Sequence, residues 1–506
     1  MGRLRPGAAE LGSFTISAAG SAGRERSTGS RTISPMPIYL DHAATTPLRR
    51  EALEAMLPYL TEQFGNASSL HSFGRRARAG LDEAHEKVAA ALGATPREIV
   101  FTSGGTEANN LAVKGAAWAG KARGHRIITT AVEHHSVGHT VRYLEKFGFE
   151  IVEIPVDRYG RVDPEEIEAA ITPKTILVSV MLANNEVGTI QPIAEVAARV
   201  RRYKGVLLHT DAVQAAPYLP IDLGALDVDL LTIAAHKFEG PKGVGAMFVR
   251  HGTNLLAQQQ GGAQERYRRA GTENVAGAVG MARALELSVA ERPETVARLA
   301  ELRTTLTAAV VGAAVVGAGG GASGGTGAGG GASGGAGAGG SSGGGVGGPV
   351  DVHETGHPIE RLPGLASFVA LGLDGTAVTI ALDLAGVACS TGSACVSGSN
   401  EVSHVLTAMG YPEDEAKGAL RFSLGRNTTA AEIAEAAELI VSTLAHQREA
   451  AALLAAQGAE ALGRSAVHVS SRAGGGAGVS ATGAAGATSA ASAAEAGAGA
   501  AEASAG

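Results

Sequence analysis

The sequence predicts an α/β protein whose large domain is a mostly parallel, seven-stranded sheet covered by helices. Seven short apolar runs are mostly separated by stretches with helical spacing, an alternation typical of a parallel sheet buried on both faces. Strands and helices resume at His357 and continue to Gly425, which predicts a second, smaller α+β domain. The seven runs are Ile99–Thr102, Arg126–Thr130, Ile151–Val156, Thr175–Met181, Val206–His209, Leu230–Ala234 and Ala246–Val249.

Helices are indicated by apolar spacing and by one capping pattern. Asn66–Arg78 is polar and is predicted to be a loop, and Ala77–Leu92 follows it with apolar residues at helical intervals. Ala282–Val311 is also predicted to be helical. Thr429, with a glutamate three residues later, has the pattern of a capping box, and the helix that it opens is predicted to extend to about Leu462.

Three segments have compositions that cannot build a core. Residues 1–36 overlap in composition with a transit peptide, but they lack an amphipathic period and are predicted to be an unstructured extension. Gly317–Gly348 is almost pure Gly, Ala and Ser, and residues 466–506 form a similar tail, so both are predicted to be disordered. The predicted division is an extension (1–36), a small domain (37–55 and 284–462, with the insert 317–348), a large domain (56–283) and a tail (463–506).

Composition excludes several classes of protein. The chain has 506 residues, a formal net charge of −7 and only two cysteines, Cys389 and Cys395. This charge provides no basic field for nucleic acid. Two cysteines cannot form a disulfide framework, so we expect a reducing compartment, the cytoplasm. No apolar run is long enough to span a membrane, so we expect no membrane association.

Lys237 lies where the buried run Leu230–Ala234 gives way to a turn rich in glycine and proline. In open α/β sheets, ligands bind at the carboxyl ends of the strands. A partly desolvated lysine at such a place can lose its proton and attack a carbonyl to form a Schiff base. Taken alone, the position favours the ordinary alternative, a lysine whose ammonium group stays in solvent.

Polar residues at three further strand ends change that balance. His134 follows the second run, Asn185 follows the fourth, and Asp211 follows the fifth. The carboxyl ends of parallel strands meet at one rim of a sheet, so these side chains are expected to converge with Lys237. The glycine-rich turn Thr102–Asn110 opens a helix and is suited to an anion, although a plain helix entry has the same pattern.

An aldehyde cofactor with a phosphate and a pyridine ring requires this set of groups. Lys237 would supply the amine and Asp211 the carboxylate that keeps the pyridine nitrogen protonated. His134 would stack on the ring, Gln214 would donate to the ring hydroxyl, and Thr106 would bind the phosphate.

Cys395 and Arg421 are candidates for the substrate side of such a site. Cys395 lies among small residues in STGSACVSGS, as in a mobile loop, where a thiol can be exposed and act as a thiolate nucleophile, although an ordinary cysteine fits these residues equally well. Cys389 ends an apolar run and is predicted to be a buried small hydrophobe. Arg421 alternates with Leu420 and Phe422 and offers a fork for a carboxylate, although a surface arginine fits equally well.

The ordered set of motifs resembles that of the NifS-like cysteine desulfurases, which are pyridoxal-phosphate enzymes of the class V aminotransferase group. The resemblance covers about Ile38 to Leu444 except Gly317–Gly348. It implies pyridoxal 5'-phosphate as the cofactor, L-cysteine as the substrate, L-alanine as a product and a persulfide for an iron–sulfur scaffold or a tRNA-thiolation relay. The motifs are IYLDHAATTP, FTSGGTEANNLAVKG, EHHSV, VSVMLANNEVGTIQPI, HTDAVQAA, AHKFEGPKGVG, RRAGTENVAG, STGSACVSG and LRFSLGRNTT.

The resemblance also implies roles for individual positions, and it implies no metal. Lys237 matches the Schiff-base lysine, His134 the ring-stacking histidine, and Cys395 the nucleophile that takes the sulfur. The other matches are cofactor ligands at Gly105, Thr106, Asp211, Gln214 and His236, a phosphate ligand from the other subunit of a homodimer at Thr272, and substrate-carboxylate ligands at Asn185 and Arg421.

Two departures from the family motivate alternatives. Ala234 stands where the family usually has a phosphate-binding serine, which removes one hydroxyl contact, and Glu239 adds a negative charge near Lys237. A selenocysteine lyase or a related class V lyase would share the cofactor site, but the context of Cys395 weighs against it. A scaffold protein with weakened catalysis is suggested by Ala234 and the Gly-rich segments, but the complete cofactor set argues against it.

Overall fold

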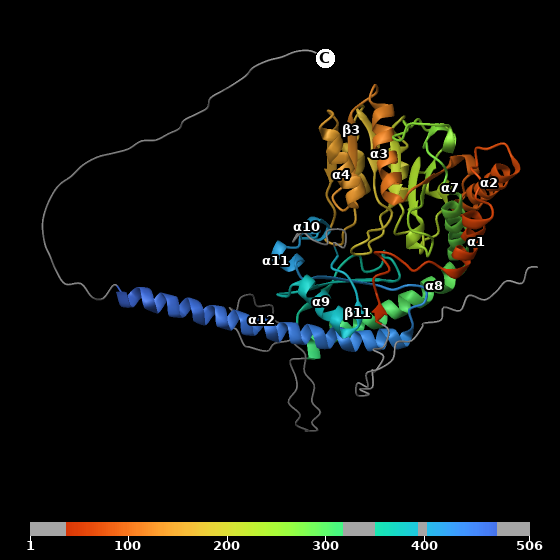
Figure 1. Ribbon diagram of the computed structural model, residues 1–506. Helices are drawn as coiled ribbons and strands as arrows, with labels where there is room; N and C mark the ends of the chain where they lie inside the picture. The colour runs from red at the N-terminus through yellow and green to blue at the C-terminus, as the bar shows by residue number, and fades with distance from the viewer. Residues whose placement is uncertain (1–36, 317–349, 393–401, 473–506) are drawn as a thin grey trace, which may run out of the picture.

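The computed structural model describes residues 37–316, 350–392 and 402–472 (Figure 1). The predicted extension at residues 1–36, the insert Gly317–Gly348 and Cys395 lie outside these residues, as does the chain from residue 473 onward. Among the helices of the described residues, none is long and apolar enough to cross a membrane.

A seven-stranded sheet forms the centre of the large domain, as predicted. Its spatial order is β2, β8, β7, β6, β5, β3, β4, and all pairs are parallel except those that β8 makes with β2 and β7. All seven predicted runs are strands, with boundaries close to those expected. The strands are β2 (Ile99–Thr102), β3 (Arg126–Thr130), β4 (Glu150–Ile154), β5 (Thr175–Ser179), β6 (Leu207–Asp211), β7 (Leu230–Ala234) and β8 (Gly245–Val249).

Helices cover both faces of this sheet because successive strand residues point to opposite sides. Ile127 packs in a core with helices α3 and α4, whereas its neighbour Ile128 packs in a core with α2, α6 and the first part of α8. The helices of this part of the chain are α1 (Arg50–Thr61), α2 (Ser72–Leu92), α3 (Gly105–Gly120), α4 (His135–Glu145), α5 (Pro164–Ala170), α6 (Ile193–Val200), α7 (Leu223–Leu226) and α8 (Val275–Val316).

Helix α2 begins earlier than the sequence suggested. Asn66–Arg78 was expected to be a loop, but the helix starts at Ser72. The ring of His71 accepts a hydrogen bond from the backbone N–H of Gly74 and so caps the first turn. The histidine satisfies an amide that a helix start otherwise leaves without a partner. Because histidine is not among the strongly preferred capping residues, the sequence pattern did not reveal this start.

A second, three-stranded antiparallel sheet lies beside the first in the order β12, β10, β9. Strand β1 (Ile38–Tyr39) pairs in parallel with β11 (Val387–Ala388), so the start of the described chain joins this second unit. The regular structure resumes at β9, before the predicted His357. The remaining elements are β9 (Val352–Glu354), β10 (Leu365–Ala370), β12 (Ala419–Ser423), α9 (Gly375–Ala385), α10 (His404–Ala408), α11 (Glu413–Ala416) and α12 (Ala430–Arg472).

The predicted capping box opens the last helix. The carboxylate of Glu432 accepts hydrogen bonds from the backbone N–H of Thr429 at 2.7 Å and from its hydroxyl at 2.9 Å. Helix α12 then continues to Arg472, past the predicted end at Leu462 and into the segment expected to be a tail. Figure 1 shows its final part extending beyond the rest of the fold. Alanine, which favours helices, is frequent before Leu462, and no proline interrupts the sequence from there to Arg472.

Helix α8 belongs to both hydrophobic cores. Met281 and Leu285 pack in the core of the large sheet, whereas Leu299 and Leu306 pack in the second core with β10, β12 and α12. Figure 1 shows the helix running from one part of the molecule into the other. One continuous helix therefore connects the two units, and the exact domain boundaries stay a prediction.

Phe368 tests the second core. Its side chain is fully buried, with its ring centroid 6.0 Å from that of Phe422. Phe368→Ala should reduce the free energy of unfolding by about 3–5 kcal/mol, because it removes a large side chain and leaves a cavity. Urea unfolding at fixed protein concentration measures this loss.

A matched control is Ile380→Ala on α9, where the side chain is 58% exposed and the change should stay within about 0.5 kcal/mol. Equal losses for the two variants would contradict the assignment of Phe368 to a packed core.

Candidate active site

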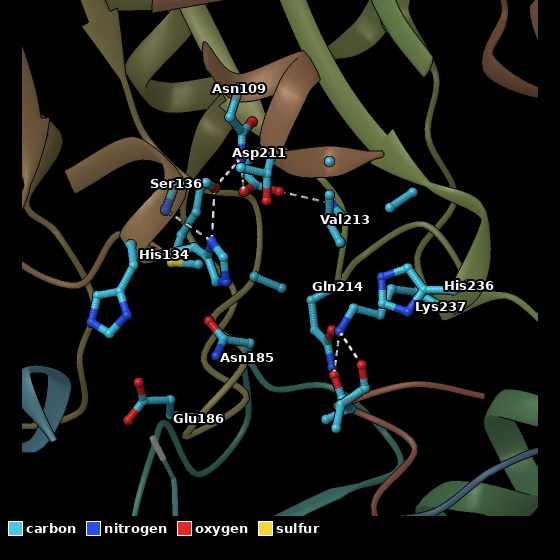
Figure 2. Close-up of a pocket in the computed structure, with 18 of the residues that line it drawn as sticks. Asn109, His134, Ser136, Asn185, Glu186, Asp211, Val213, Gln214, His236 and Lys237 are labelled. Atoms are coloured by element: carbon cyan, nitrogen blue, oxygen red, sulfur yellow. Dashed lines mark hydrogen bonds between the residues drawn. The ribbon is translucent and has the colours of Figure 1, made fainter. Parts of the chain in front are cut away.

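The carboxyl ends of several strands open into one cavity of about 360 Å³ (Figure 2). Residues from the large sheet form most of its wall, and Arg421 reaches it from β12 of the second sheet. Thr272 is exposed and is not among the lining residues, and Cys395 lies outside the described part of the chain. The predicted site residues that line the cavity are Gly105, Thr106, His134, Asn185, Asp211, Gln214, His236, Lys237 and Arg421.

Lys237 projects into this cavity from a short 3-10 turn that follows β7. Its Nζ donates to the backbone carbonyl of Ala43 at 2.5 Å and to that of Ala44 at 2.9 Å. Both carbonyls belong to the segment after β1, so the amine is held between two distant parts of the chain (Figure 2). The alternative of a lysine that extends into open solvent does not describe this geometry.

The negative charge of Glu239 is balanced by arginines. Its carboxylate accepts a hydrogen bond from Nε of Arg426 at 2.6 Å and lies 3.9 Å from Nε of Arg49. Its backbone is in the left-handed region, with φ of 61°. The negative charge that Glu239 adds near Lys237 is therefore paired with cations.

Asp211 is a buried carboxylate at the end of β6. Its Oδ2 accepts a hydrogen bond from Nδ2 of Asn109 at 2.6 Å, and its Oδ1 accepts one from the backbone N–H of Val213 at 2.9 Å. Both donors are neutral, and a buried carboxylate gains most from a cationic partner. The protonated nitrogen of a pyridine ring is a group of that kind.

The start of α3 gives the cavity a place suited to an anion. Gly105 and Thr106 form the first turn of α3, where backbone amides and the helix dipole favour negative charge. A side chain at Gly105 would meet Val213 Cγ2 at 2.9 Å, so only glycine leaves this approach open. Burial and the charge of Lys237 lower the pKa of His236 to about 4, so its ring is a neutral hydrogen-bonding group. Ala234 lies in this wall and offers no hydroxyl.

These features fit pyridoxal 5'-phosphate. The cavity is lined by the first turn of α3, which favours an anion, by the buried carboxylate of Asp211, and by the amine of Lys237, which donates to two backbone carbonyls. Oε1 of Gln214 is also buried and has no hydrogen-bond partner within the described part of the chain. A bound ring hydroxyl would supply the missing donor.

Arg421 is a buried cation at the second-domain side of the cavity. It is 1% exposed, which excludes the alternative of a surface arginine. Its Nη2 donates to Oδ1 of Asp41 at 3.0 Å, and its Nη1 donates to the carbonyl of Asn185 at 2.9 Å. Its Nε has no partner among the described residues. The guanidinium thus retains donor capacity for a carboxylate in the cavity.

Cys389 does not have the character of a nucleophile. It packs against the second core, and burial raises the pKa of its thiol to about 12. The thiol is therefore protonated at neutral pH. The side chain is partly buried rather than fully buried as predicted.

The sequence reasoning missed four groups at the cavity. Asn109 lies one helical turn after Gly105, and Ser136 follows His134 by two residues, so both were within motifs that had already been identified. His135 stacks on His404 and on the exposed His139, each with ring centroids 4.8 Å apart. Burial and the neighbouring imidazoles lower the pKa of His135 to about 4. His404 comes from the second domain, and no local pattern indicated it.

Glu133 is a buried carboxyl group next to this site. Its Oε1 accepts hydrogen bonds from the hydroxyl of Thr130 and from the backbone N–H of Met181, both at 2.8 Å. It thereby connects the end of β3 with the residues after β5. Burial raises its pKa to about 8, and the charge of Asp211 adds to the effect.

Comparison with known proteins places this geometry among related chains. The Aminotransferase class-V family matches residues 38–310. Cysteine desulfurase IscS of Dictyoglomus turgidum is 46% identical over 392 residues, which are 78% of this chain and 90% of the relative. Cysteine desulfurase IscS of Methanosarcina thermophila is 43% identical over 403 residues, which are 80% of this chain and 91% of the relative.

Solved structures agree with these relatives. A NifS-like protein aligns with a TM-score of 0.70 at 35% identity, covering 80% of this chain and 99% of that chain. A NifS-like protein from Rickettsia africae aligns with a TM-score of 0.66 at 30% identity, again covering 80% of this chain and 99% of that chain.

The buried Glu133 provides a pH-dependent test. Its pKa is about 8 in the folded protein against an ordinary value of 4.5, so between these values the folded chain binds a proton that the unfolded chain releases. Its contribution to stability therefore falls as pH rises through this window. Glu133→Gln does not titrate, so its free energy of unfolding relative to wild type should rise from near pH 5 to near pH 8. The gain should be up to about 4 kcal/mol, at about 1.4 kcal/mol per pH unit.

Urea unfolding at the two pH values checks this, with the exposed Glu145→Gln as the control. A stability difference that is constant with pH would contradict a protonated Glu133.

Proposed function

We propose roles for individual residues of this chain, which belongs to the Aminotransferase class-V family and is a pyridoxal-phosphate-dependent cysteine desulfurase. The reaction converts L-cysteine to L-alanine and leaves the sulfur as a persulfide on an enzyme cysteine. One observation carries the assignment of roles: Lys237, Asp211 and His134 come from the ends of separate strands, Arg421 comes from β12 of the second sheet, and all four line a single cavity.

The cofactor would be held at both ends of the cavity. When bound, pyridoxal 5'-phosphate supplies an electrophilic carbonyl and an electron sink. Asp211 would pair with its ring nitrogen, His134 would stack on its ring, and the side-chain amide of Gln214 would hydrogen-bond to its ring hydroxyl. Lys237 would be the point of covalent attachment. The phosphate ligands would be Gly105, Thr106 and His236, with Thr272 from the partner subunit.

Arg421 and Asn185 would bind the carboxylate of L-cysteine. Arg421 is buried and is held by Asp41 and by the Asn185 carbonyl, so little side-chain freedom is lost when a carboxylate binds. The planar guanidinium orients such a carboxylate by two parallel hydrogen bonds. This fixes the α-carbon of the substrate relative to Lys237, whose amine would take the α-proton as a general base.

Cys395 would carry the sulfur. Its thiolate attacks the sulfur of L-cysteine, the carbon–sulfur bond breaks, a sulfur–sulfur bond forms on Cys395, and the released carbon takes a proton to give L-alanine. The step needs no external oxidant: the substrate sulfur becomes the outer sulfur of the persulfide, and the carbon that it leaves is reduced to the methyl group of L-alanine. Gly392 lines the cavity and precedes Cys395 by only three residues, which supports this choice. The raised pKa of Cys389 disfavours the other cysteine.

The partners follow from the same roles. Thr272 lies in RRAGTEN, away from the cavity of its own chain, and this supports a homodimer in which it serves the neighbouring site. The persulfide would pass to an acceptor thiol, on an iron–sulfur scaffold or a tRNA-thiolation relay in the cytoplasm. A scaffold protein with weakened catalysis gains no support from the cavity, because every predicted cofactor residue except Thr272 lines it. A selenocysteine lyase or a related class V lyase would share this cavity, and the context of Cys395 weighs against it.

Lys237→Ala should abolish covalent attachment of the cofactor, because the amine that faces the cavity is removed. Borohydride reduction followed by intact mass and peptide mapping measures the attachment. Lys242→Ala, which removes an exposed lysine five residues further along, should leave the attachment unchanged. Cofactor fixed to a different lysine in Lys237→Ala would show that the assignment is wrong.

Cys395→Ser should stop persulfide formation and L-alanine release, because a serine hydroxyl is almost fully protonated at neutral pH and attacks sulfur poorly. Cofactor binding should persist, since the cavity that would hold it is built on strand ends. Cys389→Ser should retain turnover and lose about 1–3 kcal/mol of stability, because it buries a hydroxyl group. Mass spectrometry of the persulfide, an alanine assay and urea unfolding measure these effects. The reverse pattern of activity would move the nucleophile to Cys389.

A further inference from the structure

We propose that Asn109 is a positioning residue that joins the carboxylate of Asp211 to the ring of His134 through Ser136. The inference deepens the proposed function and rests on the roles proposed there for Asp211 and His134. Asn109 lies on α3, and its side chain is 1% exposed at the cavity wall. Figure 2 shows Asn109, Ser136 and His134 one below another, joined by hydrogen bonds, with Asp211 beside Asn109.

The direction of each hydrogen bond can be worked out from the groups involved. Nδ2 of Asn109 lies 2.6 Å from Oδ2 of Asp211 and 2.8 Å from Oγ of Ser136. An ionised carboxylate can only accept, so the atom that faces Asp211 must be the amide nitrogen. That nitrogen has two hydrogens, and it gives one to Asp211 and the other to Ser136.

Ser136 then fixes the tautomer of His134. Its hydroxyl accepts from Asn109, so its single hydrogen is directed to Nδ1 of His134, 2.7 Å away. The backbone N–H of Ser136, 3.1 Å from the same nitrogen, can only donate. Nδ1 is therefore an acceptor, and neutral His134 carries its proton on Nε2. Nε2 is then the nitrogen that can give a proton to a molecule in the cavity.

One amide thus sets two features of the site together. It holds the carboxylate proposed to pair with the ring nitrogen, and it orients the hydroxyl that holds the imidazole proposed to stack on the ring. Oδ1 of Asp211 keeps the Val213 amide, so only Oδ2 depends on Asn109. Removing the Asn109 side chain therefore affects both Asp211 and His134, whereas removing the Ser136 hydroxyl affects only His134.

Four variants of the full-length protein separate these effects. Asn109→Ala should weaken the binding of pyridoxal 5'-phosphate by about tenfold to a hundredfold, because it deletes a hydrogen bond to a charged group. Ser136→Ala should weaken it less, because the contacts of Asp211 remain. Asn110→Ala is the matched control and should bind as wild type does, because among the described residues its side-chain amide donates only to the Thr106 carbonyl in its own helix. Asp211→Asn should also weaken the binding of pyridoxal 5'-phosphate, and this expectation follows from the role proposed for Asp211 without any role for Asn109.

The readouts do not depend on turnover. Dissociation constants come from titration of the cofactor-free proteins, and their thermal unfolding shows whether each variant folds. Nitrogen-15 NMR of the histidine rings in the cofactor-free wild type should show His134 protonated at Nε2, which needs no variant.

Protonation at Nδ1, or unchanged affinity in Asn109→Ala while Asp211→Asn binds weakly, would overturn the role of Asn109. Unchanged affinity in Asp211→Asn would instead overturn the proposed role of Asp211, and this inference with it.

Discussion

Parallel strand pairing decides where this molecule can carry out chemistry, because each parallel strand delivers its last residues to the same edge of the sheet. Strands β3, β5, β6 and β7 are parallel neighbours, and each is followed at once by polar side chains of the cavity. The backbone amides of the strands bond to each other, so the groups at this edge are held by a rigid framework. A site built this way needs few additional contacts to stay in place.

The second unit contributes residues to the cavity that the large sheet forms. Arg421 on β12 reaches the cavity, and the segment after β1 supplies the carbonyls that hold Lys237. Both β1 and β12 belong to the second unit, which α8 connects to the first through two separate cores. The part of the cavity proposed to hold the cofactor is thus built mainly on the large sheet, and the part proposed to hold the substrate depends on how the two units meet.

Much of this arrangement could be predicted, because it follows from local pattern. The strands are short apolar runs, and the residues just after them lie at the rim for geometric reasons, so Asp211 and Lys237 were found without a structure. The start of α2, the end of α12 and the pairing of Glu239 with Arg426 could not be found this way. The start of α2 depends on an unusual histidine cap, and α12 continues because no proline ends it before Arg472. The pairing of Glu239 depends on a partner that is far away in the sequence. Asn109 and Ser136 lie inside motifs that the sequence analysis identified, but the hydrogen bond between them can be seen only in the structure.

The reversed strand β8 has a different relation to the functional edge. Because it runs against its neighbours, it presents its first residue there, and that residue is Gly245. A methyl group at this position would come within 2.7 Å of the carbonyl carbon of Gly104, directly before the turn that contains Thr106. The backbones of Gly245 and Gly104 thus lie in contact where β8 begins, next to the turn proposed to bind an anion. Substitution of Gly245 by a larger residue is therefore limited by the backbone of Gly104, a residue that lies far away in the sequence.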